Sequence, residues 1–184
     1  MSTPRPSHPQ IALTLLDLKR AHQEARANAD LYDDEDARED LYDVEDAATE
    51  TLRLIIAVHG WPGHALVGEA GAEAAWWIAH HCEDRAFQQE ALELLNGAVH
   101  AGEAKRDQLA FLTDRVRVLA GRPQLYGTQF EFGSTGLHAY AVEAPEDLDA
   151  RRAEMGLSPF DAFDKLVRGF YPLHSPPDSG SSKQ

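Results

Sequence analysis

Two histidines, His59 and His81, are the side chains in this sequence that best suit acid/base chemistry. His59 ends a predicted helix in the stretch VHGWPGHALVG, where a protonated imidazole gains from the helix dipole. His81 falls on an apolar helix face with Trp77 and Ile78, and imidazole titrates near neutral pH. We therefore predict His59 and His81 as a catalytic pair. The alternative for His81 is a core histidine whose hydrogen bonds are satisfied.

Arg115 is the predicted anion-binding residue. It shares a helix face with Phe111 and Val118, and a half-buried guanidinium must find a partner. That partner is either an acidic side chain in a structural salt bridge or the carboxylate or phosphate of a ligand.

The segment QLYGTQ, residues 124–129, is richer in hydrogen-bonding side chains than an ordinary strand. Its glycine, Gly127, allows close backbone approach or a bulge. Such a strand could contact a ligand, or it could be an exposed edge strand kept polar against aggregation. Together with Arg115, the predicted ligand-contacting residues are Trp61, Gln124, Tyr126, Thr128 and Gln129.

We predict neither a metal nor a cofactor. The sequence has no H-E-x-x-H motif, no cysteine pair and no Gly-rich phosphate loop. His59 and His81 lie on different helices and could converge on an ion, but their spacing does not show it. Cys82 follows His81, yet adjacent helical residues point about 100° apart, so a Cys–His nucleophile is not favoured.

Helical periodicity predicts the elements that position these residues. From Val44 to Ile56 apolar side chains recur at helical spacing, and Gly60 with Pro62 predicts the end of that helix. The helix around Trp77 is apolar on two faces and rich in alanine, which is typical of a central helix with close neighbours. Further helices are predicted at 11–29, 69–84, 87–98, 109–119, 145–155 and from Ser158 onward.

Residues 124–142 instead alternate with the period of a strand, with a turn at Ser134, Thr135 and Gly136. The predicted fold is mainly α: an antiparallel bundle of about six to seven helices with a small appended β-hairpin at about 124–142. We expect one folded domain over residues 10–171. The proline-rich residues 1–9 and the polar residues 172–184 are predicted to be disordered.

The charge of the chain is strongly negative, with 31 acidic and 17 basic residues and a net charge of −14. This repels phosphate backbones and anionic lipids, so we expect neither nucleic acid nor membranes as partners. The single cysteine excludes an internal disulfide, and no signal or membrane-spanning segment is seen, so we expect a cytoplasmic protein.

Ten of the acidic residues lie in one stretch, Asp30–Asp46. Two interpretations stay open for it: a solvated, mobile connector between helices, or a docking strip for a basic protein partner or a divalent cation. The stretch has no EF-hand arrangement.

Several motifs taken together resemble a bacterial family of uncharacterised helical domains, common in actinobacteria. The family carries HGWP, then QH with an acidic residue, then LTDR, then Q-x-YGTQ, and the likeness covers roughly residues 13–157. Residues that match the pattern are His59, Gly60, Trp61, Pro62, Gly68, His81, Gln88, Asp114, Arg115, Gln124, Tyr126, Gly127, Thr128 and Gln129.

Two positions depart from the family pattern. His22 replaces the aspartate of a D-Q-x-x-R motif that Gln23 and Arg26 otherwise match. His80 replaces a glutamine, which places it outside the site that the resemblance implies.

Two functions follow as hypotheses. The first is a small enzyme, of specialised metabolism, that uses histidine acid/base chemistry on a small polar or anionic molecule between the bundle and the hairpin. The second is an acidic binding or regulatory module, of the immunity or antitoxin type, whose polar motifs are structural and whose acidic strip meets a basic partner.

Overall fold

The computed structural model describes residues 5–32, 35–133 and 136–170. This described part is mainly helical and carries one two-stranded hairpin, as the sequence predicts. Its elements, in chain order, are α1 (Pro9–Tyr32), α2 (Glu35–His59), α3 (His64–His81), α4 (Arg85–His100), α5 (Arg106–Leu119), β1 (Phe130–Gly133), β2 (Gly136–Ala139), the 3₁₀ turn η1 (Pro145–Asp147), α6 (Leu148–Glu154) and α7 (Phe160–Phe170).

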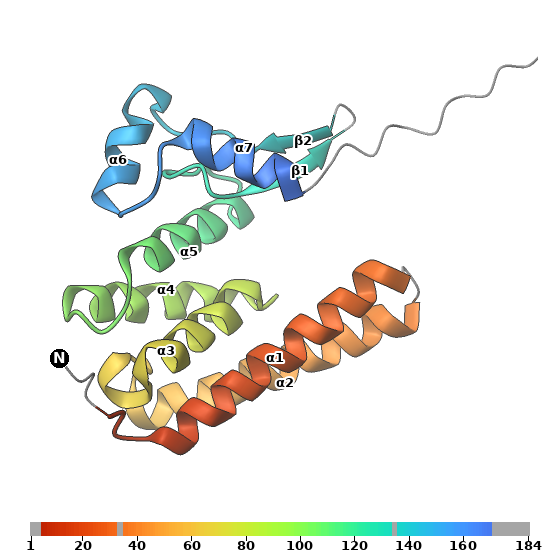
Figure 1. Cartoon of the computed structure of the whole chain (residues 1–184), viewed down its shortest axis with the longest axis vertical. Helices are drawn as coiled ribbons and strands as arrows, with labels where there is room; N and C mark the ends of the chain where they lie inside the picture. The colour runs from red at the N-terminus through yellow and green to blue at the C-terminus, as the bar shows by residue number, and fades with distance from the viewer. Residues whose placement is uncertain (1–4, 33–34, 134–135, 171–184) are drawn as a thin grey trace, which may run out of the picture.

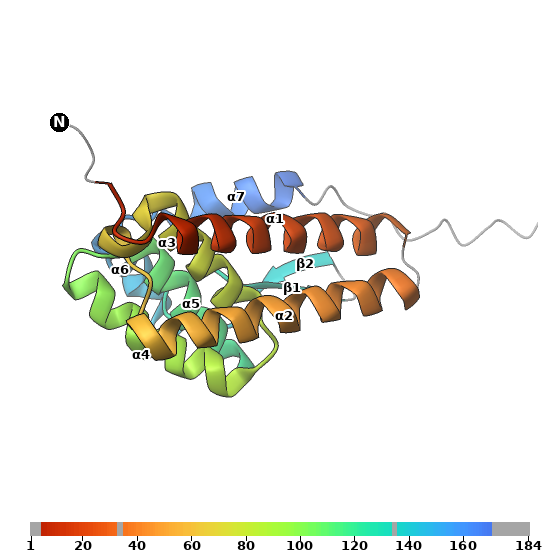
Figure 2. The ribbon, with the colours of Figure 1, turned by 90° about the horizontal axis from the view of Figure 1, so that it is seen from below.

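Helix α1 packs on both α2 and α3, and the three form the N-terminal part of the molecule (Figures 1 and 2). The chain reverses between α1 and α2, so these two are antiparallel. Helices α1 and α3 are parallel, because residue numbers rise in the same direction along both: Ala12 lies beside Gly71, and His22 lies beside Trp77. A Cβ on Gly71 would lie 3.2 Å from that of Ala12, which shows that small residues do permit the close approach expected of α3.

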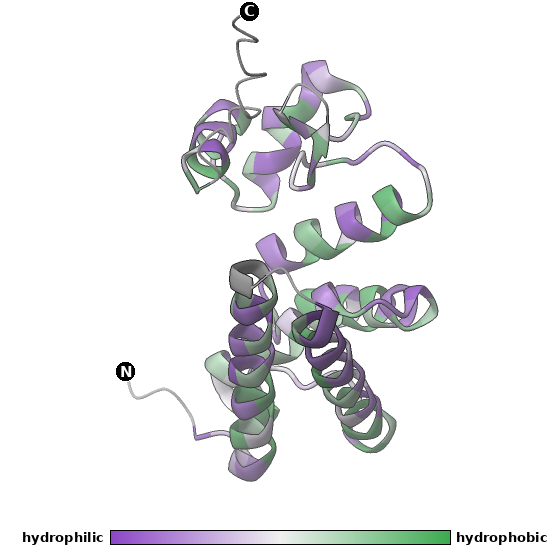
Figure 3. Cartoon of the chain, turned by 90° about the vertical axis from the view of Figure 1, so that its right-hand side faces the viewer, coloured by the Kyte–Doolittle hydropathy of each residue, from purple (hydrophilic) through white to green (hydrophobic). Residues whose placement is uncertain are grey.

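The interpretation of the acidic stretch Asp30–Asp46 as a mobile connector is wrong for the residues that the structure describes. Helix α1 continues to Tyr32 and α2 already begins at Glu35, so nearly all of the acidic stretch is helical; residues 33 and 34 lie outside the described part. Acidic side chains favour the first turn of a helix because they complement its dipole, and Glu35 and Asp36 occupy that turn. Most of these side chains are exposed, and the first turns of α2 are hydrophilic in Figure 3.

The loop between α2 and α3 explains the HGWPG sequence. Helix α2 ends at His59, and Gly60 adopts φ +72°, a left-handed conformation that favours glycine, as predicted for the stop. Glu103, from the turn before α5, then caps α3: its carbonyl accepts from the amide of His64 and its carboxylate from that of Ala65 at 2.6 Å. A Cβ on Gly63 would lie 2.6 Å from that of Glu103, so only glycine allows this approach.

Residues 5–8 belong to the stretch for which the sequence predicts disorder, but they lie against the start of α3. The amides of Ser7 and His8 donate to the carbonyls of Ala65 and Leu66 at 3.0 and 2.9 Å. Gly68, at φ +74°, kinks α3 at this point, and the N-terminal segment supplies donors for carbonyls beside the kink. The predicted disordered tail, residues 172–184, lies outside the described residues.

Helix α5 lies between the N-terminal helices and a layer formed by β1, β2, α6 and α7 (Figure 1). The antiparallel hairpin pairs Phe130 with Ala139 and Gly133 with Gly136. It is shorter than predicted, because residues 124–129 form a loop around the end of α5 rather than a strand. Ser134 and Thr135 of the predicted turn lie outside the described residues.

Aromatic side chains join α5 to the C-terminal layer. The rings of Phe111 and Phe163 are 5.8 Å apart between centroids, and Phe163 also lies 5.9 Å from Phe130. Among the described helices, none is both long enough and apolar enough to cross a membrane.

Candidate functional site

A cluster of three histidines lies at the C-terminal end of α3. His80 and His81 end this helix, and His22 approaches them from α1. Ring centroids are 4.8 Å apart for His80 and His81, and 5.3 Å apart for His22 and His81. We call these three residues the histidine cluster.

His22 is held in one tautomer by two partners. The indole Nε1 of Trp77 donates to His22 Nδ1 at 2.8 Å, so Nδ1 carries no proton. Nε2 must then be the protonated nitrogen, and it donates to Glu45 Oε1 at 2.8 Å. His22 is 2% exposed, and through it the three helices α1, α2 and α3 are connected by hydrogen bonds.

His81 is oriented by Trp77 from the preceding turn. The two rings stack at 4.1 Å between centroids, and His81 Nδ1 bonds to the Trp77 carbonyl at 2.9 Å. A carbonyl can only accept, so Nδ1 carries the proton and Nε2 holds the free lone pair. Burial lowers the pKa of His81 from 6.5 to about 4, and the charges of Arg26, His22 and Arg115 also lower it, against the Trp77 bond. His81 is therefore a neutral base near pH 7.

His80 is enclosed by aromatic rings. Trp76 and Phe111 lie 5.4 and 6.3 Å from its ring, between centroids. Burial lowers the pKa of His80 well below its usual value. The charges of His81, when it is protonated, and of Arg115 and Arg26 act in the same direction. Both of its ring nitrogens are buried without a hydrogen-bond partner in the described part of the chain. Gln88 fixes the backbone here by donating to the carbonyls of Ala79 and His80.

Two guanidinium groups act on the cluster in a chain whose net charge is −14. The guanidinium groups of Arg26 on α1 and Arg115 on α5 both act on His80 and His81. The Nε of Arg115 is buried and, among the described residues, has no hydrogen-bond partner, so the structural salt bridge considered for it does not involve this atom. Glu45 is already bonded to His22.

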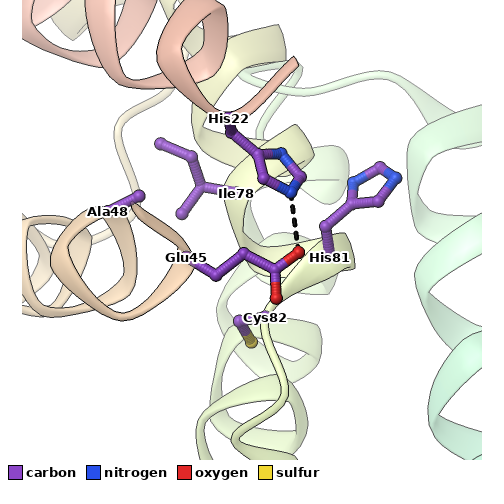
Figure 4. A pocket seen from close by; sticks show the side chains of 6 residues that line it. All are labelled: His22, Glu45, Ala48, Ile78, His81 and Cys82. Atoms are coloured by element: carbon purple, nitrogen blue, oxygen red, sulfur yellow. Dashed lines mark hydrogen bonds and ion pairs between the residues drawn. The ribbon is translucent and has the colours of Figure 1, made fainter. Parts of the chain in front are cut away.

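A small cavity of about 10 Å³ lies behind the cluster, between α1, α2 and α3, and has room for about one water molecule (Figure 4). His22, Glu45, His81 and Cys82 are among its lining residues. Burial raises the pKa of Cys82 to about 12, so its sulfur is a thiol at neutral pH and no activated nucleophile.

The structure does not bring His59 to His81. The 18 residues of α3 span roughly 25 Å at 1.5 Å per residue, and His59 precedes the start of this helix while His81 ends it. His59 is exposed, and its ring lies 4.7 Å from that of His8, between centroids. Trp61 also lies in the loop before α3, where it packs against the core.

The polar residues of 124–129 bond to one another and to Asp114 of α5. Asp114, fully buried, accepts from the amides of Leu125, Tyr126 and Thr128 and from the Thr128 hydroxyl, at 2.6 to 3.1 Å. Burial nevertheless raises the pKa of its carboxyl above the usual value, because desolvation outweighs these bonds.

Gln124 completes this network. Its side chain donates to the carbonyls of Gln129 and Tyr140 and accepts from the Gln129 amide at 2.9 Å. The Gln129 side chain donates to the Thr128 hydroxyl at 3.1 Å. These bonds hold the hairpin to α5, and none of them reaches the histidine cluster.

Three members of the cluster region were not among the predicted site residues: His22, Arg26 and His80. The spacing of His22 and Arg26, four residues apart on one helix, could have indicated a shared face. The departure of His80 from the family pattern argues against a place in the site. Its ring nevertheless lies between those of Trp76 and His81. Within the described ranges, no three His, Cys, Asp or Glu side chains are grouped to hold a metal ion.

A protein-family model described as a family of unknown function, DUF6624, matches residues 9–175. The comparisons with curated proteins and with solved structures found no match.

Proposed function

We propose that this chain is a small enzyme that uses His81 as a general base. The chain belongs to the DUF6624 family of unknown function. The substrate is a small anionic molecule that binds at the histidine cluster. This proposal differs from the pocket expected between the bundle and the hairpin, because the histidine cluster lies at the C-terminal end of α3. The observation that carries the proposal is the state of His81: it is neutral, its Nδ1 bonds to the Trp77 carbonyl, and its Nε2 has no hydrogen-bond partner among the described residues.

The hydrogen-bonded partners of His81 suit this role. A general base needs an orienting bond on one ring nitrogen and a lone pair on the other, directed at the proton to be removed. The Trp77 carbonyl supplies the first. Trp77 is itself held by His22, and His22 by Glu45, so the base is positioned by side chains from three helices.

The cationic surroundings suit an anionic substrate. Arg115 and Arg26 raise the local potential around both histidines, and a bound anion would be attracted by this potential in a protein that otherwise repels it. An anion would also raise the affinity of His81 for a proton, and thereby strengthen it as a base in the complex.

The test is turnover by the purified chain of a panel of phosphate monoesters, carboxylate esters and 2-oxo acids, followed by NMR. At least one compound is expected to react, with a rate that H81Q lowers about 10²- to 10⁴-fold, the usual worth of a positioned histidine. The matched control is H100Q, because His100 is exposed and, within the described part of the chain, bonds to the carbonyl of Asn96 alone. No turnover of any compound, or equal rates in wild type and H81Q, would contradict the proposal.

H59N addresses the pairing predicted from the sequence. If His59 were the partner of His81, H59N and H81Q would lose turnover together in spite of the length of α3 between them. A loss confined to H81Q would assign the chemistry to the histidine cluster.

The acidic module is the second candidate function. Glu35, Asp36, Glu39, Asp40 and Asp43 lie on the first turns of α2, all exposed, at the end of the α1–α2 pair that extends beyond α3 (Figure 1). A helical, exposed strip of one sign favours a basic partner. A pull-down at low and at high salt checks this, since a charge-driven complex is expected only at low salt.

A further inference from the structure

The starting observation is that two buried side chains at the cluster have nitrogen atoms without partners in the described part of the chain, whereas a third unpaired atom nearby, Gln88 Oε1, is an acceptor and cannot bind an anion. These nitrogens are both ring nitrogens of His80 and Nε of Arg115. Buried polar groups are nearly always hydrogen-bonded, because an unmade bond costs about 1–3 kcal/mol. The two groups lie on α3 and α5, which contact each other, so a single partner from outside the chain is the simplest way to satisfy both.

We infer that a phosphoryl group of the substrate supplies this missing partner, held between His80, His81 and the guanidinium groups of Arg115 and Arg26. The inference rests on the proposed function, whose anionic substrate it assigns to a chemical class. It identifies Arg115 and His80 as binding residues, next to the base His81.

Charge favours an anion over a water molecule. Water could hydrogen bond to His80, but it would leave the charge of the half-buried Arg115, which acts on both histidines, without a counter-charge. Two carboxylates are already engaged: Glu45 with His22, and Asp84, which follows α3, with Arg53 of α2. An anion from outside the chain would balance the charge.

Charge also favours a phosphoryl group over a carboxylate. Two permanent cations, Arg26 and Arg115, lie on opposite helices, and a phosphate monoester carries close to two negative charges at neutral pH. Its several oxygens can accept from Arg115 Nε and from a His80 N–H at the same time, and arginine is well suited to bidentate phosphate binding. A carboxylate would balance one guanidinium only.

Entry of a ligand would pass Arg26. This residue is exposed and lies one turn beyond His22 on α1, whose C-terminal part extends past α3 (Figure 1). Its long, flexible side chain can move without unfolding of a helix.

The first test is an NMR titration of the full chain with inorganic phosphate, methyl phosphate and sodium acetate as probes. Saturable shifts of the His80 and His81 imidazole signals are expected with both phosphates, with affinity at least tenfold above that of acetate. Bound phosphate is also expected to move the titration midpoint of His81 upward from about 4. The charged groups that face His81 in this titration are His22 and Arg26 from α1, Glu45 from α2, His80 from α3 and Arg115 from α5.

The matched variants are R115M and R122M. Arg122 is an exposed arginine just after α5, so R122M removes the same charge without touching the cluster. R115M is expected to weaken phosphate binding at least tenfold, R122M to leave it unchanged, and R115K to fall between them because it keeps the charge but not Nε. Circular dichroism of R115K shows whether the fold persists.

Absence of saturable shifts in the wild type, equal affinities for acetate and phosphate, or equal losses in R115M and R122M would each overturn the inference. Binding is measured here without turnover, so the two proposals can fail separately. Phosphate binding without turnover of any panel compound contradicts the enzyme and leaves the phosphoryl site intact. His81-dependent turnover without phosphate binding contradicts the phosphoryl site and supports the enzyme.

Discussion

The indole Nε1 of Trp77 donates a 2.8 Å hydrogen bond to Nδ1 of the buried His22. This bond decides which nitrogen of His22 carries the proton, and the same tryptophan stacks on His81 and accepts from it through its carbonyl. One residue of α3 therefore orients two of the three histidines in the cluster.

Replacement of Trp77 by phenylalanine is expected to release the tautomer of His22. W77F keeps an aromatic ring beside His81 but removes the indole N–H that donates to His22 Nδ1. The buried acceptor is then left unpaired, at a cost of about 1–3 kcal/mol. Long-range nitrogen–proton NMR of the imidazole is expected to show the Nε2–H form in the wild type and a mixture in W77F.

The matched control for this change is W76F. Trp76 also donates a buried hydrogen bond through Nε1, to the carbonyl of Gln108 at 2.9 Å. W76F is expected to lose a comparable free energy of unfolding and to leave the His22 tautomer unaltered. A mixture of tautomers in W76F as well would mean that Trp77 has no specific role.

Acid is expected to destabilise the fold through His81. The folded-state pKa, about 4, lies below the unfolded value of 6.5, so the unfolded chain binds more protons between these values. The contribution is fully present above pH 6.5 and is lost as pH falls toward 4, by roughly 3 kcal/mol if the whole shift is realised. His80 acts in the same direction.

Urea unfolding at pH 7.5 and pH 5 measures this effect. H81Q is expected to lose less of its free energy of unfolding between the two pH values than the wild type does. H100Q, which changes an exposed histidine, is expected to follow the wild type. An H81Q protein with the same acid sensitivity as the wild type would show that His81 is not the group responsible.

Removal of the Asp114 carboxylate is expected to loosen the 124–129 loop. In D114N one acceptor oxygen is replaced by an amide donor that faces other donors, among them the amide and hydroxyl of Thr128. A loss on the order of 2–4 kcal/mol in the free energy of unfolding is expected, together with faster hydrogen exchange at the Thr128 amide.

The control for this prediction is D161N, which changes an exposed aspartate on α7. It is expected to be neutral within about 0.5 kcal/mol, as most surface substitutions are. If D114N were equally neutral, the network around Asp114 would not be what holds the hairpin to α5.

Local sequence determined most of the secondary structure. The helical stripe from Val44 to Ile56 and the stop at Gly60 depend on spacing and backbone conformation within a few residues, so they could be predicted. The prediction of a mobile connector before Val44 is wrong because charge alone does not prevent a helix. Glu35 and Asp36 complement the helix dipole at the start of α2.

Only the tertiary structure decided which polar residues meet. Arg115 and His81 could be predicted as candidates because each is a polar residue on an otherwise apolar helix face. That pattern can be read from the sequence of one helix alone. That His22 and Glu45 orient Trp77, and that His59 lies at the other end of α3, depends on helix direction and packing. The role of Asp114 also depends on tertiary packing. Its carboxylate accepts hydrogen bonds from backbone amides of residues 124–129, which a pattern of polar side chains cannot reveal.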